Sequence, residues 1–152
     1  MKRYAVARTL PWAREQLFDL AADVASYPQF LPGWLDVQIL DQTPQLLRVR
    51  QRLGLGPVHH TFTSNAELLR PRQVLISTSD APFQHLHIHW QFREDGHTGC
   101  RVSLGVELET GSSVFETALA RLFEVTTPDI IARFEERAMH LYGNAQDSVR
   151  QR

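Results

Sequence analysis

The chain has 152 residues, of which 43% are hydrophobic and 22% charged, and its formal net charge at pH 7 is −1. This length suits one domain, and the composition is that of an ordinary folded globule rather than a disordered chain. No apolar run approaches the roughly 20 residues of a membrane span, the near-zero charge argues against a DNA-binding protein, and the single Cys100 excludes an internal disulfide. We therefore expect one domain over residues 1–143, followed by a polar tail over residues 144–152.

The N-terminal part of the chain predicts a strand, a helix and a bent connector. Residues 4–10 alternate as a strand does and are stopped by Pro11, and residues 12–22 carry apolar side chains at the spacing of one helical face. The connector contains Pro28 and Pro32, which fix φ and lack a backbone donor, so only a short helical turn and a bend fit here. The bend directs three side chains toward the interior: Tyr27, Phe30 and Leu31.

Six further segments alternate polar and apolar residues with a period of two, which predicts strands with one buried face. These segments are residues 35–39, 47–53, 58–68, 74–78, 86–92 and 102–108. The connections between them are short, so neighbouring strands must be antiparallel. Together with the first strand they predict a curved sheet of about seven strands whose apolar face needs a cover.

The last predicted element is a long amphipathic helix, the only one large enough to cover that face. Ser113 and Glu116 match a capping box at its start, and Gly143 is placed as a C-terminal cap. Pro128 predicts a kink at which the helix restarts with Thr127 as N-cap, either to form a hinged lid or to follow the curvature of the sheet. The predicted fold class is α+β: an antiparallel sheet wrapped on a long C-terminal helix, with two short helices after the first strand.

Three motifs, in this order along the chain, resemble a known family. They are Tyr27-Pro28-x-Phe30-Leu31-Pro32 preceded by Asp23-Val24, then Pro82-Phe83-x-x-Leu86-x-x-x-Trp90-x-Phe92, and finally Phe134-Glu135-x-Arg137-Ala138. The chain resembles the coenzyme Q-binding START-like family, which includes ubiquinone-binding proteins and bacterial ribosome-association toxins. This resemblance implies a helix-grip fold of the START/Bet v 1 type, shared with polyketide cyclase-like proteins, with a cavity between the sheet and the long helix.

The resemblance also implies a lipophilic ligand in that cavity, ubiquinone or a related prenylated quinone or lipid, and a role in respiratory quinone function. In such a site apolar side chains replace water around the isoprenoid tail, and a few polar groups fix the head. The residues expected to contact the ligand, some as core and some as lining, are Tyr27, Phe30, Leu31, Gln51, His60, Phe62, Phe83, Trp90, Phe115, Leu119 and Phe134. No cofactor besides such a ligand is expected, and no catalytic residue is assigned.

Gln51, His60 and Ser64 are polar residues at positions whose alternation points inward. If the turn over residues 54–57 pairs the residues that flank it, Gln51 lies opposite His60. A buried polar group costs about 1–3 kcal/mol unless it is hydrogen-bonded. These groups therefore satisfy one another, bind internal water or meet the polar head of a ligand.

Arg48, Arg50 and Arg52 form a basic row on the predicted outer face. The row suits phosphates of RNA or of lipid headgroups, or else it is a solvated face that prevents sheet aggregation. With the toxin branch of the family, it makes binding to the large ribosomal subunit the alternative function. A third interpretation, a polyketide aromatase or cyclase, needs an acid or base in the cavity, for which His60 is the candidate.

His85, His87 and His89 alternate with apolar residues and therefore point away from the core. Imidazoles are good metal ligands, but side chains on one strand face diverge, whereas metal ligands must converge. We therefore predict an exposed polar face and no metal site.

The residues after Met1 alternate instead of forming a continuous apolar run, so no signal peptide is expected. We expect a cytoplasmic bacterial protein, because no Arg/Ser-rich presequence is visible, with the surface of the inner membrane as a candidate transient contact.

Overall fold

The computed structural model describes residues 1–81, 83–96, 99–111 and 113–143. Its elements follow the predicted order of strand, helix, short helix, six strands and long helix. They are β1 (Lys2–Leu10), α1 (Arg14–Ala22), the 3-10 helix η1 (Val24–Gln29), β2 (Trp34–Gln42), β3 (Leu46–Leu55), β4 (Val58–Leu69), β5 (Gln73–Thr78), β6 (Phe83–Asp95), β7 (Gly99–Thr110) and α2 (Ser113–Tyr142). Within these described residues, no helix is both long enough and apolar enough to cross a bilayer.

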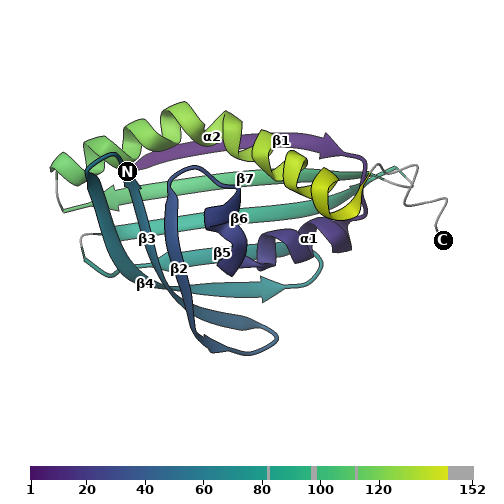
Figure 1. Cartoon of the computed structure of the whole chain (residues 1–152), viewed down its shortest axis with the longest axis horizontal. Helices are drawn as coiled ribbons and strands as arrows, with labels where there is room; N and C mark the ends of the chain where they lie inside the picture. The colour runs from purple at the N-terminus through teal and green to yellow at the C-terminus, as the bar shows by residue number, and fades with distance from the viewer. Residues whose placement is uncertain (82, 97–98, 112, 144–152) are drawn as a thin grey trace.

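The strands form one antiparallel sheet in the order β1-β7-β6-β5-β4-β3-β2. β1 pairs with β7 from Lys2 opposite Leu108 to Leu10 opposite Cys100, so the first and last strands of the chain are neighbours. In Figure 1, β2 and β3 turn away from the direction of β6 and β7, and α1 and η1 lie in the hollow of this curved sheet. α2 runs along β1 and β7 (Figure 1), and the predicted helix-grip architecture is confirmed.

Hydrogen bonds hold α2 to the elements that precede it in the chain. The Tyr4 hydroxyl of β1 donates to the Ala120 carbonyl oxygen over 3.1 Å, and the Trp12 indole N–H donates to the Gly143 carbonyl oxygen over 3.1 Å. Gly143 has a φ of +72°, and its N–H donates to the Met139 carbonyl oxygen over 2.8 Å. A left-handed glycine bonded back to the last turn is a typical helix end, so the predicted C-terminal cap is confirmed.

The predicted restart of the long helix at Thr127 is wrong. The helix is continuous over Ser113–Tyr142, with Pro128 inside it. Thr127 is 4% exposed, and its hydroxyl donates to the Phe123 carbonyl oxygen one turn earlier instead of capping a new helix. Pro128 removes one backbone hydrogen bond, but Phe123 and Ile130 on either side of it are completely buried. Their packing against the sheet maintains the helix where its backbone is weakened, so α2 follows the sheet as one element.

Three sequence predictions concern parts that the structure does not describe. They are Pro82 in the second motif, the Ser113 side chain in the capping box, and the tail over residues 144–152. The elements beside these positions keep their expected places, since β6 begins at Phe83 and α2 ends at Tyr142.

Candidate functional site

Stacked aromatic rings fill the centre of the interface between the sheet and α2. Trp90 on β6 and Phe134 on α2 have ring centroids 4.8 Å apart, and both side chains are at most 1% exposed. Leu119, nearer the start of the same helix, is also 1% exposed. The structure therefore places these three predicted ligand contacts in close-packed core.

Tyr27 on η1 is completely buried beside this stack. Its hydroxyl donates to the Ala21 carbonyl oxygen, and its ring meets Phe30 and Trp34 edge-on, at centroid distances of 6.0 and 5.6 Å. Burial raises the pKa of Tyr27, while the nearby indole N–H of Trp90 opposes that shift. The Trp90 N–H is itself buried and completes no hydrogen bond with another described residue. Tyr27 is therefore a neutral donor that locks the connector onto α1.

The first and third sequence motifs meet at the rim of this core. Leu31 is buried, whereas Phe30 is half-buried with the Arg137 guanidinium 5.5 Å from its ring centroid. Arg137 also donates to Gln29 Oε1 over 3.0 Å. The arginine of the C-terminal motif thus fixes the position of the Tyr-Pro connector.

A second aromatic cluster lies where α2 begins. Phe83 on β6 contacts both Phe62 on β4 and Phe115 on α2, with ring centroids 4.7 and 5.5 Å apart. His60 stands at the edge of this cluster, 5.6 Å from the Phe115 ring, and is exposed. His60 thus points to the inner face, as predicted, and lies opposite the buried Leu53. It is exposed and not buried as expected, because its position two residues into β4 places it near the end of the sheet.

Gln51 forms a buried polar network on the inner face of β3. Its Oε1 accepts from the Trp34 indole N–H over 3.1 Å, and its Nε2 donates to Ser64 Oγ over 2.6 Å. Gln51 lies opposite Phe62 and not, as predicted, opposite His60. Sequence reasoning also missed Trp34, which is 3% exposed and comes one residue before the alternating segment that predicted β2.

The two-residue turn between β3 and β4 explains why the cross-strand partner of Gln51 was predicted wrongly. Leu55 pairs with Val58, so only Gly56 and Pro57 form the turn, and Gly56 has the positive φ of +59° that short hairpin turns require. The predicted four-residue turn shifted the pairing by two residues. A shift of two keeps every side chain on its face and changes only its neighbour across the strands.

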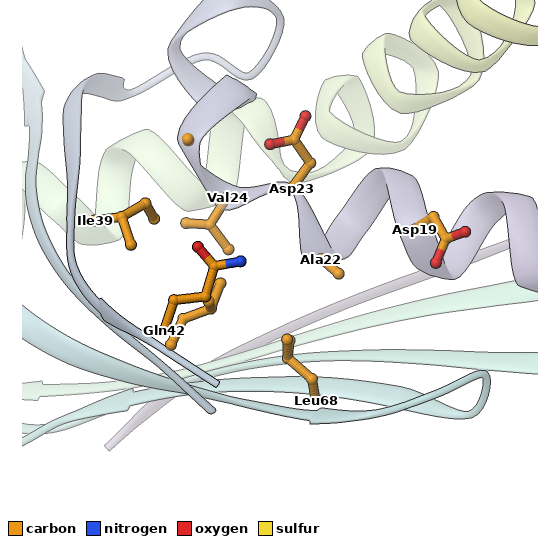
Figure 2. Close-up of a pocket in the computed structure, with 9 residues that line it drawn as sticks. Asp19, Ala22, Asp23, Val24, Ile39, Gln42 and Leu68 are labelled. Atoms are coloured by element: carbon orange, nitrogen blue, oxygen red, sulfur yellow. The ribbon is translucent and has the colours of Figure 1, made fainter. Parts of the chain in front are cut away.

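A pocket of about 340 Å³ opens between α1–η1 and the strands β2–β4. Figure 2 shows the side chains of Val24, Ile39 and Leu68 around this space, with the Gln42 amide beside them and the Asp23 carboxylate at the rim. The remaining residues that line it are Asp19, Ala22, Ala25 and Leu47. The pocket therefore combines apolar walls with a polar rim, the usual composition of a small-molecule site.

Asp19, which lines this pocket, also forms an ion pair between α1 and the turn after β4. Arg70 Nε and Nη2 donate to the two carboxylate oxygens of Asp19, over 2.8 and 3.1 Å. The alternation of β2 and β4 placed Ile39 and Leu68 on the inner face, but no sequence signal placed α1 beside them. The pocket was missed for that reason.

The arginine row lies on the outer face of β3, as predicted, and alternates with the buried side chains of that strand. Arg48 lies opposite Asp41 and Arg52 opposite Asp36 on β2, whereas Arg50 lies opposite a glutamine. No ion pair among the described residues includes these arginines. The row is thus a basic strip with acidic residues along one side.

A family model described as polyketide cyclase / dehydrase and lipid transport matches residues 10–135 of the chain. The ribosome association toxin RatA of Escherichia coli K12 is 30% identical over 139 residues, which cover 90% of this chain and 88% of that protein. The mitochondrial coenzyme Q-binding protein COQ10 homolog B of Xenopus laevis is 25% identical over 148 residues, which cover 94% of this chain and 60% of that protein.

Solved structures share the fold. The Zhui aromatase/cyclase of Streptomyces sp. R1128 superposes with a TM-score of 0.77 at 18% identity, over 92% of this chain and 95% of that one. The 18 kDa protein CC1736 of Caulobacter crescentus superposes with a TM-score of 0.76 at 26% identity, over 95% of this chain and 100% of that one.

Proposed function

The chain belongs to the polyketide cyclase / dehydrase and lipid transport family, and we propose on this premise that it binds a lipophilic small molecule with a polar head, of the prenylated quinone class. Ubiquinone is the expected ligand, and support of respiratory quinone function is the expected role. This proposal includes that the protein resides in a bacterial cytoplasm. It also includes that the protein contacts the inner membrane surface transiently and takes up its ligand there.

The observation that carries the proposal is the pocket of Figure 2, with apolar walls and a polar rim. Ile39 and Leu68, which line the pocket and are only partly buried, would contact an isoprenoid segment and remove it from water, which stabilises the complex by about 0.8 kcal/mol per buried CH₂. The Gln42 amide at the rim can donate to a quinone carbonyl. A volume of about 340 Å³ accommodates a head and a short part of its tail, so the rest of the tail must follow the inner surface or leave the pocket.

The chemistry of the buried polar side chains favours ligand binding over a polyketide cyclase activity. In the described part of the chain, the buried polar side chains are amides and hydroxyls: Gln51, Ser64, Thr110 and Thr127. These four are not acids or bases of the kind that an aldol cyclisation needs. Two buried titratable groups, the Tyr27 phenol and the Cys100 thiol, have their pKa raised by burial, and the Tyr27 hydroxyl donates to a backbone carbonyl. His60, the candidate base, is exposed at the end of the sheet.

The first test is organic extraction and mass spectrometry of the protein purified from its own host, followed by titration with a short-chain ubiquinone. Leu68→Arg places a charge in the pocket, and Leu69→Arg is its matched control, because Leu69 is the next residue of β4 and is 44% exposed. We expect Leu68→Arg to weaken quinone binding at least about tenfold and Leu69→Arg to leave it unchanged. Equal affinity in a folded Leu68→Arg protein would refute the pocket as the binding site.

Binding to the large ribosomal subunit is a second candidate. The observations that favour it are the similarity to RatA proteins over most of both chains and the basic strip of Arg48, Arg50 and Arg52. An exposed basic strip can contact RNA phosphates, and such contacts weaken as salt increases.

Co-sedimentation with large subunits tests this candidate. Arg48→Ala/Arg50→Ala removes two charges from the strip, and Arg93→Ala/Arg101→Ala removes two from exposed, directly opposed positions on β6 and β7. Loss of co-sedimentation only in the first double variant would support the strip as a specific contact. Equal loss in both would indicate non-specific attraction of a basic surface.

A further inference from the structure

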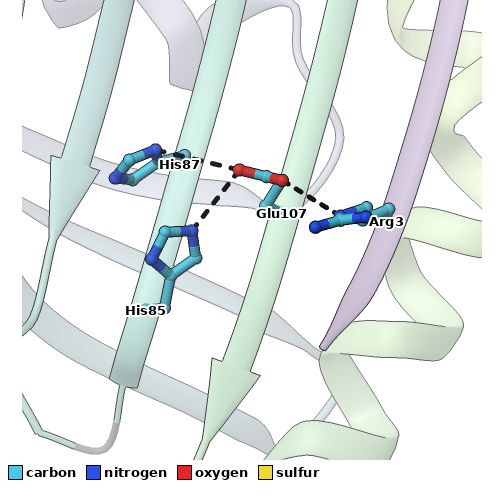
Figure 3. Close-up of polar contacts among 4 residues, drawn as sticks. All are labelled: Arg3, His85, His87 and Glu107. Atoms are coloured by element: carbon cyan, nitrogen blue, oxygen red, sulfur yellow. Dashed lines mark hydrogen bonds and ion pairs between the residues drawn. The ribbon is translucent and has the colours of Figure 1, made fainter.

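His85, His87 and Glu107 come together on the outer face of the sheet, away from the pocket and the aromatic core. His85 and His87 lie two residues apart on β6 and share a face, and Glu107 on β7 is directly opposite His87. Figure 3 shows the Glu107 carboxylate between these two rings on one side and Arg3 of β1 on the other. Three strands therefore contribute to one polar cluster.

The ligand atoms of this cluster converge on a small volume. Glu107 Oε1 lies 3.5 Å from His85 Nε2 and 3.9 Å from His87 Nδ1, and all three ligand atoms lie within 4.8 Å of one another. Zinc binds imidazole nitrogen and carboxylate oxygen at about 2.0–2.2 Å, so its tetrahedral ligands are about 3.4 Å apart. Small side-chain rotations bring these atoms to that spacing.

Part of this cluster has unused bonding capacity. His85 Nε2 is buried and has no hydrogen-bond partner in the described part of the chain, although it faces the Glu107 carboxylate. Glu107 Oε2 accepts from Arg3 Nε over 3.0 Å, which leaves Oε1 as the oxygen nearest to the histidines. A carboxylate that is oriented by an outer partner in this way is typical of metal-ligand sets.

We propose that His85, His87 and Glu107 bind a divalent transition-metal ion. Two imidazoles and one carboxylate favour Zn²⁺, with Ni²⁺ and Cu²⁺ as chemically similar occupants, over Mg²⁺ or Ca²⁺, which prefer oxygen ligands. Three protein ligands leave at least one coordination position for solvent or another small ligand.

A neighbouring groove makes that remaining position accessible. A groove of about 430 Å³ is lined by Glu107 and His87 together with Ala5, Leu75 and Gly105. Gly105 has no side chain, and the space above it is open. An ion held by the three ligands is therefore at the edge of a groove wide enough for a small anionic or carbonyl ligand.

His89 provides a matched control within the same strand. It shares the face of His85 and His87, but its Nε2 lies 3.0 Å from Gln73 Oε1, so its ring is already held by an amide on β5. His89→Gln removes an imidazole from the same surface without touching the three proposed ligands.

The test is titration of the full chain, first stripped with a chelator, with ZnSO₄ in competition with a metallochromic dye. We expect one saturable equivalent, at least about tenfold weaker in His85→Gln, His87→Gln and Glu107→Gln and unchanged in His89→Gln. Co²⁺ in place of Zn²⁺ should give the visible bands of a tetrahedral or five-coordinate ion, and thermal unfolding without metal confirms that each variant is folded.

Three results would overturn the proposal. They are no saturable zinc binding up to about 1 mM, undiminished binding in any one of the three ligand variants, or an equal loss in His89→Gln. The inference is independent of the proposed quinone site, so a negative quinone titration leaves it unaffected.

Discussion

Two polar clusters, one on the inner and one on the outer face of the sheet, differ in how their side chains are paired. On the inner face, the buried amide of Gln51 is hydrogen-bonded at both ends, to Trp34 and Ser64. On the outer face, His85 and its neighbours surround Glu107, and a buried ring nitrogen of His85 has no hydrogen-bond partner in the described structure. Fully paired buried groups stabilise one conformation, whereas gathered groups with unused capacity are available to a ligand.

The largest effect is expected for the aromatic stack of the inner face. Phe134→Ala removes the ring that stacks on Trp90 and leaves a cavity in close-packed core. We expect a loss of about 3–5 kcal/mol in the free energy of unfolding, measured by urea denaturation. A loss below about 1 kcal/mol would mean that the interface is loosely packed. It would then support the originally expected cavity between the sheet and α2.

The thiol of Cys100 offers a probe of the same face without mutation. It is completely buried on β7, and burial raises the pKa of this thiol to about 11. At pH 8 only about one thiol in a thousand is ionised at that pKa, so reaction with a disulfide reagent should be slow until the protein unfolds. Fast labelling of the native protein would show that the inner face opens.

A moderate effect is expected from the Gln51 network. Gln51→Leu keeps the volume but leaves the Trp34 indole N–H and the Ser64 hydroxyl without this partner. We expect a loss of about 1–3 kcal/mol in unfolding free energy, and a smaller one for Ser64→Ala, which removes one bond of the network. A neutral Gln51→Leu would indicate that water reaches these groups and that the pairing is not required.

The smallest effect is expected on the outer face. Arg50 is exposed, lies opposite a glutamine and forms no ion pair in the described structure, so Arg50→Ala should change the unfolding free energy by less than about 0.5 kcal/mol. A loss comparable with that of Gln51→Leu would remove the distinction between the two faces. The same variant therefore suits binding assays, because it alters charge without altering the fold.

Much of the fold was predictable because it depends on local periodicity. The alternation in residues 58–68 and 86–92 correctly separated inward from outward side chains, since successive residues of any strand point to opposite faces. Gly143 was correctly placed as a helix end, because the residue after a helix often has a left-handed backbone conformation, which glycine adopts without steric cost. The three motifs also indicated the family that the family model confirms.

Only the tertiary structure determined which of these side chains meet. A two-residue turn at Gly56 placed Gln51 opposite Phe62 instead of His60, and packing carried α2 through Pro128 without a restart. The pocket needs α1 beside β2–β4, and the proposed metal ligands need Glu107 beside β6. Strand alternation is a property of the backbone of each segment, whereas register, helix continuity and the convergence of ligands depend on contacts between residues far apart in the chain. The sequence therefore determined the faces, and the fold decided the neighbours.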